Sequence, residues 1–179
     1  YYPFFNAIET TGTKVVTNPL HYQDGRYSMD FDDLALKCAD PGVKMAILCS
    51  PHNPVGRVWT EDELRRFGQI CMNNNVLIVS DEIHGDLILG GRKFTPYATL
   101  GPEYEDQSII CTSPSKTFNL AGLQASNLII SNQAMRDNFN RALAKVGLFT
   151  LNSFGIAAVE AACNHGEHWL DQLLPYLED

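Results

Sequence analysis

The sequence lacks the marks of a membrane protein, of a disulfide-rich protein and of a nucleic-acid-binding protein. No apolar run approaches the roughly 18 residues that a membrane helix needs, and no secretory signal is expected. The five cysteines include no CxxC pair, so we expect neither a disulfide framework nor a zinc cage. Because 13 Lys and Arg stand against 21 Asp and Glu, no basic face is expected for nucleic acid. We therefore expect a cytoplasmic protein without membrane or nucleic-acid partners.

What the sequence does have is the composition of a folded domain. Its 179 residues are 45% hydrophobic and 19% charged, which is enough apolar material for one sizeable core. There is no internal repeat and no Gly/Ser/Pro-rich linker that would divide the chain. The abrupt start (YYPFF) and the helix-like end (LLPYLED) lead us to expect a fragment or an isolated domain.

Short apolar runs alternate with helical patterns along the chain. Continuous apolar strands separated by helices predict a mainly parallel sheet covered by helices, so we expect a three-layer α/β/α fold. The predicted strands are Met45–Cys49, Val76–Val79, Ile109–Cys111 and Leu128–Ile130, with a further short strand at Lys14–Thr17.

Helix-start signals mark the segments between these strands. Asp30 is the predicted N-cap of a helix that ends near Ala39, and Thr60 with Glu63 forms a capping box before the next helix. The asparagines at 73–75 are expected to end that helix. Further helices are predicted at 4–11, after Asn132 and from Ser153 onward.

Polar segments follow three of the predicted strands. They read SPHNPVGR at 50–57, SDEIHGD at 80–86 and TSPSKTFNLAGLQ at 112–124. Ligands of open α/β sheets bind just beyond the carboxyl ends of the strands. The three segments are therefore expected to converge on one pocket.

Lys116 is the chemically suggestive residue of the third segment. It stands among hydroxyls, including Ser113 and Ser115. Partial desolvation or cationic neighbours would lower the pKa of such a lysine, and its neutral amine could then form a Schiff base with an aldehyde. Hydroxyls at a helix start would suit a phosphate group. Each residue alone has an ordinary interpretation as a turn, cap or surface residue, and only their combination indicates a site.

A metal site is the alternative that the same strand ends allow. Their carboxylates and imidazoles are of types that suit a divalent metal, but a metal site would leave Lys116 and the serines without a role. We therefore expect no metal. The ligands of such a site would be His52, Asp81, Glu82, His84 and Asp86.

The phrases CSPHNPVGRVWT, VSDEIHGDL and TSPSKTFNLAGLQ, together with the opening YYPFFNAIE, resemble those of a known family. They are similar to fold-type I pyridoxal-phosphate (PLP) enzymes of the class I/II aminotransferase superfamily. The likeness is greatest to the MalY/PatB-type branch of cystathionine β-lyases and other carbon–sulfur lyases. The resemblance implies that residues 1–179 form the central part of the PLP-binding large domain, with the N-terminal segment and the C-terminal small domain absent.

The resemblance also implies roles for three residues at the strand ends. Lys116 would form the Schiff base with PLP and later act as general base on the substrate α-carbon. Asp81 would face the pyridine nitrogen and keep it protonated. Asn53 would hydrogen-bond the ring 3-oxygen.

Further cofactor contacts follow from the same likeness. Ser113 would hold the cofactor phosphate with Ser115 close by, and Tyr1 would stack on the ring. His84 occupies a cofactor-binding position where many aminotransferases have tyrosine, and Gln124 stands where many relatives have a phosphate-binding arginine. Both departures favour the lyase branch.

The implied function is α,β-elimination from cystathionine or a related cysteine conjugate, a small amino-acid substrate, by an enzyme that is a homodimer in its full-length form. Transamination is the close alternative because it shares the first proton abstraction. A catalytically inactive fragment or binding module of the same fold is the third possibility.

Overall fold

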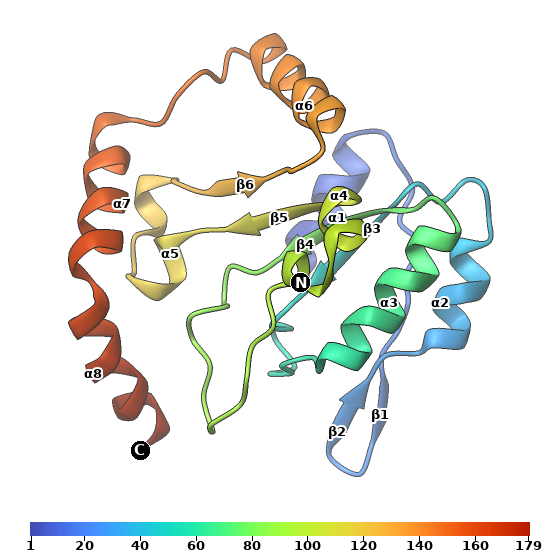
Figure 1. Ribbon diagram of the computed structural model, residues 1–179, viewed down its shortest axis with the longest axis horizontal. Coiled ribbons are helices and arrows are strands. Elements are labelled where there is room, and N and C mark those ends of the chain that lie inside the picture. The colour runs from blue at the N-terminus through green and yellow to red at the C-terminus, as the bar shows by residue number, and fades with distance from the viewer.

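The computed structural model describes residues 1–179 and has the expected α/β fold (Figure 1). Its main sheet has the strand order β3-β4-β5-β6. The strands β3, β4 and β5 run parallel, and β6 pairs antiparallel with β5. The sheet is thus mainly parallel, as predicted. Its strands are β3 (Met45–Cys49), β4 (Leu77–Asp81), β5 (Ser108–Thr112) and β6 (Asn127–Ile129).

The register of the parallel strands corrects one predicted boundary. The sequence pattern ended the second strand at Val79, but β4 continues to Asp81, because Ser80 and Asp81 still pair with Leu48 and Cys49 of β3. Polar residues at the end of a strand carry no apolar signal, although their backbone groups complete the ladder. This extension matters for the candidate site because it fixes the backbone of Asp81 within the sheet.

The helices α2 (Phe31–Cys38) and α3 (Glu61–Asn73) pack together against one face of this sheet (Figure 1). The predicted capping box is confirmed: Glu63 N donates to Thr60 Oγ1 at 3.2 Å, and Thr60 N donates to Glu63 Oε2 at 2.8 Å. The end of α3 is also as predicted, because Asn75 has a φ of 56°. The core between these helices and the sheet consists of Met29, Leu34, Cys38, Leu48, Trp59, Leu64, Phe67, Cys71, Val76, Ile78, Tyr97, Leu100, Tyr104 and Ile110.

The helices near the C-terminus contribute little to that core. Of all their residues only Gly155 is buried, and α7 and α8 lie across the view from α2 and α3 (Figure 1). No helix combines the length and the apolar character needed to cross a lipid bilayer. The remaining helical elements are α1 (Tyr2–Thr10), η1 (Tyr97–Leu100), α4 (Pro102–Asp106), α5 (Pro114–Thr117), η2 (Ala121–Leu123), α6 (Gln133–Lys145), α7 (Ser153–His165) and α8 (Glu167–Glu178).

The predicted strand at Lys14–Thr17 is wrong, because this segment has no strand partner. The strands nearby are β1 (His21–Gln23) and β2 (Arg26–Ser28), which form an antiparallel hairpin. Its turn is Asp24-Gly25, with φ values of 50° and 75°. An Asp-Gly pair is a strong hairpin signal because both central residues of the favoured turn have positive φ, so the hairpin could have been predicted from these two residues.

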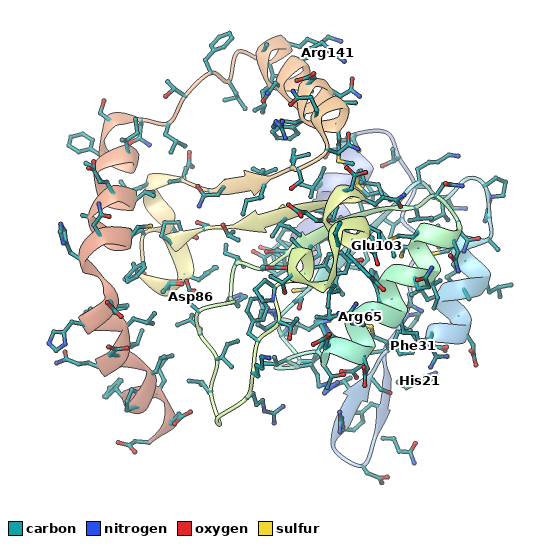
Figure 2. All side chains as sticks on the ribbon, in the orientation of Figure 1. His21, Phe31, Arg65, Asp86, Glu103 and Arg141 are labelled. Atoms are coloured by element: carbon teal, nitrogen blue, oxygen red, sulfur yellow. The ribbon has the colours of Figure 1, made fainter.

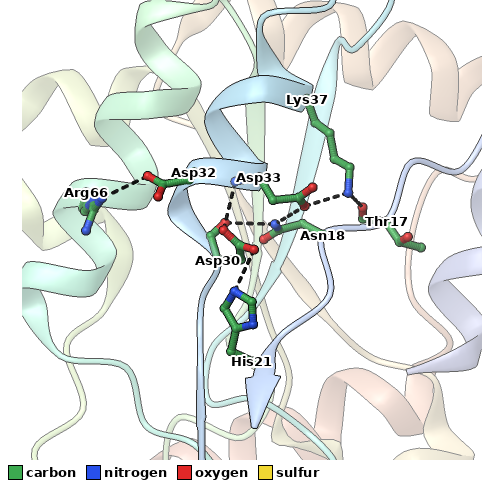
Figure 3. Close-up of polar contacts among 8 residues, drawn as sticks. All are labelled: Thr17, Asn18, His21, Asp30, Asp32, Asp33, Lys37 and Arg66. Carbon is green, nitrogen blue, oxygen red and sulfur yellow. Dashed lines mark hydrogen bonds and ion pairs between the residues drawn. The ribbon is translucent and has the colours of Figure 1, made fainter. Parts of the chain in front are cut away.

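Polar side chains hold the segment before the hairpin to the start of α2 (Figure 3). Asp30 caps the helix by accepting from Asp33 N at 2.9 Å, as predicted. His21 Nε2 lies 2.7 Å from Asp30 Oδ2, and Asn18 Nδ2 donates to Asp33 Oδ2 at 2.7 Å. Lys37 completes the group with an ion pair to Asp33 at 2.6 Å. Side-chain hydrogen bonds and ion pairs, rather than strand pairing, therefore attach this segment to the rest of the fold.

Replacing Gly68 with alanine is expected to destabilise the fold. Gly68 lies inside α3, where a Cβ would come 2.7 Å from Cε1 of Tyr104 and would collide with the Tyr97 hydroxyl. Overpacking of this kind costs about 1–3 kcal/mol, which outweighs the gain of about 1 kcal/mol in helix propensity. Urea unfolding of Gly68→Ala measures the change. Gly122→Ala is the matched control, because no atom lies within 4 Å of its added Cβ; equal stabilities for the two variants would contradict the packing account.

Candidate active site

The register of the sheet brings the three polar segments together. Cys49, Asp81 and Cys111 are neighbours across β3, β4 and β5. Just beyond this row, Ser50 N donates to the carbonyl of Asp81 at 2.9 Å, and Glu82 N donates to that of Cys111 at 2.8 Å. The segments that follow therefore leave the sheet side by side at one edge. The cavity of about 450 Å³ at this edge is lined by residues of the first two segments, and no residue of 112–124 lines it.

Lys116 and Asp81 lie close enough to His84 for their charges to act on its imidazole. Burial lowers the pKa of His84, the charge of Lys116 lowers it further, and the charge of Asp81 opposes both effects. An imidazole so placed is neutral near pH 7, so it can donate one hydrogen bond and accept another. The carboxylate of Asp81 accepts only a local bond, from Ile83 N at 3.2 Å.

The surroundings of Lys116 differ from the expectation. Its side chain is exposed at the end of α5 and makes no hydrogen bond or ion pair. The lysine is therefore exposed in this structure, where partial desolvation was expected. The amine remains free to react with or hold a ligand.

Asn53 is held by the thiol of Cys49, the last residue of β3. Asn53 N donates to Cys49 Sγ at 3.4 Å, while Trp59 Nε1 donates to the carbonyl of Cys49 at 2.9 Å. Both ends of the loop are thus attached to β3, and burial raises the pKa of the Cys49 thiol, which keeps it neutral. The Asn53 side-chain amide has no partner and, with His84, lines a cavity of about 450 Å³.

The two serines before Lys116 differ in their availability. Ser113 is the N-cap of α5, and its buried hydroxyl donates to the carbonyl of Ala125 at 2.6 Å while accepting from Ser115 N at 3.0 Å. The Ser115 hydroxyl has no partner and is half-buried. Gln124 is exposed at the end of η2, in the left-handed region with a φ of 51°. The hydroxyl free to bind a ligand is that of Ser115.

Tyr1 lies near this edge of the sheet, although its ring contacts no predicted site residue. The ring is 48% exposed and lies edge-on to Phe4, with centroids 5.3 Å apart. Burial lowers the pKa of His52, and the N-terminal ammonium of the chain lowers it further. The start of α1 is therefore close to the loop that carries Asn53.

The side chains proposed for a metal site do not converge. Oε1 of Glu82 is turned into the core, where it accepts from Ser80 Oγ at 3.0 Å and from Tyr97 N at 2.8 Å. Burial raises the pKa of Glu82, and these two bonds offset part of the effect. No three His, Cys, Asp or Glu side chains are arranged to hold a metal ion, so the metal alternative has no support in the geometry.

A hydrogen bond between residues far apart in the sequence joins two parts of the site. Thr117 is fully buried, and its Oγ1 donates to Asp86 Oδ2 at 2.9 Å. Asp86 thereby lies beside α5 (Figure 2), and the loop carrying His84 is tied to the helix carrying Lys116. No local pattern signals this contact, because 31 positions separate the two residues.

Comparison with known proteins shows what the chain is similar to. The profile of the family described as "Aminotransferase class I and II" matches residues 1–177. Cystathionine beta-lyase PatB of Bacillus subtilis is 47% identical over 99% of this chain and 46% of its own length. The chain thus spans less than half of that relative.

Solved structures agree with the sequence comparison. Cystalysin from Treponema denticola, which contains pyridoxal 5'-phosphate, superposes with a TM-score of 0.95 at 38% identity, over 98% of this chain and 44% of its own. The PLP-bound C–S lyase of Staphylococcus hominis gives a TM-score of 0.93 at 40% identity, over 100% of this chain and 44% of its own.

Thr117→Val is expected to loosen the loop that carries His84. The substitution keeps the shape of the side chain and removes the bond to Asp86, so the free energy of unfolding should fall by about 1 kcal/mol. Hydrogen exchange should become faster at the amides of residues 84–90. Thr117→Ser is the matched control because it keeps the hydroxyl and removes only a methyl group. Unchanged exchange in Thr117→Val would show that the bond does not hold the loop.

Proposed function

Because the chain belongs to the aminotransferase class I and II family, we propose that the protein is a PLP-dependent carbon–sulfur lyase. One observation carries the proposal: Lys116 and Asp81 both lie near His84, at the edge where the adjacent parallel strands β4 and β5 end. The reaction would convert a cysteine S-conjugate and water into a thiol, pyruvate and ammonia. Cystathionine is the proposed type of substrate.

The unengaged polar groups of the site fit PLP. The cofactor presents an aldehyde, a protonated ring nitrogen, a phenolate oxygen and a phosphate. An amine without partners at Lys116 and a carboxylate with an open lone pair at Asp81 suit the first two. The free amide of Asn53 suits the phenolate oxygen, and the free hydroxyl of Ser115 suits the phosphate. Ser113 fits less well, because its proton is already donated to Ala125.

Lys116 and Asp81 would carry the chemistry. When bound, PLP takes up the electron pair that α-proton removal leaves on the substrate. The Nζ of Lys116 would bind the aldehyde carbon of the cofactor and, once the substrate amine replaces it there, would remove the α-proton. The carboxylate of Asp81 would hold a proton on the ring nitrogen, since a fixed negative charge favours the protonated form.

The remaining residues would orient the cofactor. Asn53 Nδ2 would donate to the 3-oxygen of the ring, and the neutral imidazole of His84 would lie beside the same edge. Ser115, with Ser113 behind it, would hold the phosphate. Tyr1, which is 48% exposed, would stack on the pyridine ring.

Four wider proposals accompany this function. Residues 1–179 would form the central part of the PLP-binding large domain, since the family profile matches almost all of them. The substrate would be a small amino acid.

The full-length protein would be a homodimer. Exposed apolar side chains support this proposal, among them Phe149 and Phe154, each 80% exposed. The protein would be cytoplasmic, consistent with its five free cysteines.

Elimination is favoured over amino transfer by two residues. His84 and Gln124 stand where many aminotransferases have tyrosine and arginine, and the 47% identity to a cystathionine beta-lyase points the same way. When the β-carbon of the substrate carries a thiolate leaving group, departure of the thiolate would compete with reprotonation at the cofactor. The product therefore distinguishes the two reactions.

Cystathionine supplied to the full-length, PLP-loaded protein is expected to yield pyruvate and a free thiol, both measured colorimetrically. Lys116→Ala should abolish the yellow colour of the protein and lower the rate at least about a thousandfold, because it removes the amine that would move the α-proton. Lys145→Ala, which also removes an exposed lysine, is the matched control and should keep colour and activity. Amino transfer to a keto acid without pyruvate release would refute the lyase proposal in favour of an aminotransferase.

A further inference from the structure

A second cavity, of about 650 Å³, lies beside the one lined by Asn53 and His84. It is formed by the β1–β2 hairpin, the loop before α3 and residues 92–95, and it meets the first cavity at Gly56, Val58 and Arg92. No residue of α5 lines it. It is therefore a different place from the one proposed for the cofactor phosphate.

The walls of this cavity concentrate positive charge in a protein whose net charge is −8. Four of the 13 Lys and Arg residues line it, and three of them, Arg26, Arg92 and Lys93, make no ion pair. The one acidic lining residue, Glu61, is already held by Arg65 through both Nε and Nη2, at 2.9 and 2.7 Å. Three positive charges of the cavity thus have no counter-ion within the chain.

The fourth cation, Arg57, is buried and incompletely bonded. Its side chain stacks on Trp59, with 4.7 Å from Cζ to the ring centroid, and its Nη2 pairs with Glu63 at 2.6 Å. Burial alone would raise the pKa of Glu63, but bonds from Thr60 N and Arg57 outweigh it and hold the pKa below its usual value. The Nε–H of Arg57 is buried without an acceptor, although the residue is only 6% exposed. Buried donors seldom lack a partner, so Arg57, which lines the cavity, retains a donor that the fold leaves unsatisfied.

We propose that this cavity binds a phosphate group, either as the free ion or as part of a phosphate ester. Arginine presents its N–H groups in a fork that matches phosphate oxygens. The three unpaired charges call for an anion that carries more than one negative charge. Thr60 adds a donor, because its hydroxyl accepts from Glu63 N and keeps its own proton available. The proposal is independent of the chemistry at Lys116.

Isothermal titration of inorganic phosphate into the full-length, PLP-loaded protein tests the site. The ionic strength is held constant with chloride, and the bound cofactor keeps its own phosphate pocket filled. One phosphate per chain should bind saturably. The double variant Arg92→Ala/Lys93→Ala should weaken that binding about tenfold or more, because each charged hydrogen bond contributes substantially to affinity.

The matched control is Arg141→Ala/Lys145→Ala, which removes the same two charges from α6, where Arg141 lies well apart from the hairpin (Figure 2). It should leave the affinity unchanged. Absence of saturable binding, or equal weakening in the two double variants, would overturn the proposal. Repeating the titration with glycerol phosphate identifies the source: tighter binding points to an ester and weaker binding to the free ion.

Discussion

Cys49, Asp81 and Cys111 occupy one row of the hydrogen-bonded ladder across β3, β4 and β5, and the candidate site depends on that row. Because side chains alternate between the faces of a strand, a slip of one residue would turn Asp81 to the other face. The apolar packing of Leu48, Ile78 and Ile110 against α3 prevents such a slip. The core therefore fixes the position of the carboxylate on which the proposed chemistry relies.

Beyond the sheet, the site is built from loops, and a few buried polar bonds replace the ladder as the source of order. Glu82 accepts a hydrogen bond from Tyr97 N at 2.8 Å. This bond attaches both ends of the segment between β4 and η1 to the core. Thr117 ties Asp86 to α5, and the Cys49 thiol holds the backbone of Asn53. These bonds place His84, Lys116 and Asn53 around one edge while leaving their functional groups free to bind a ligand.

Sequence reasoning succeeded where a signal is local. The run MAILC, the capping box at Thr60 and the cap at Asp30 are short patterns with a direct backbone consequence, and all three are confirmed. It failed for Lys14–Thr17, since a strand needs a partner that no local pattern supplies. The engagement of the Ser113 hydroxyl was equally hidden, because its acceptor, Ala125, lies 12 residues away. The exposure of Lys116 depends on which distant segments pack against the single turn of α5. The residues next to Lys116 in the sequence do not predict that packing.

Lys116 and Asp81 act with opposite charges on one histidine, and an NMR titration of His84 measures both effects. In Lys116→Met the pKa of His84 should rise, because a nearby positive charge is removed; in Asp81→Asn it should fall, because a nearby negative charge is removed. Lys145→Met, a change on α6, should leave it unaltered. A His84 pKa that is the same in all three variants would contradict the convergence of these residues.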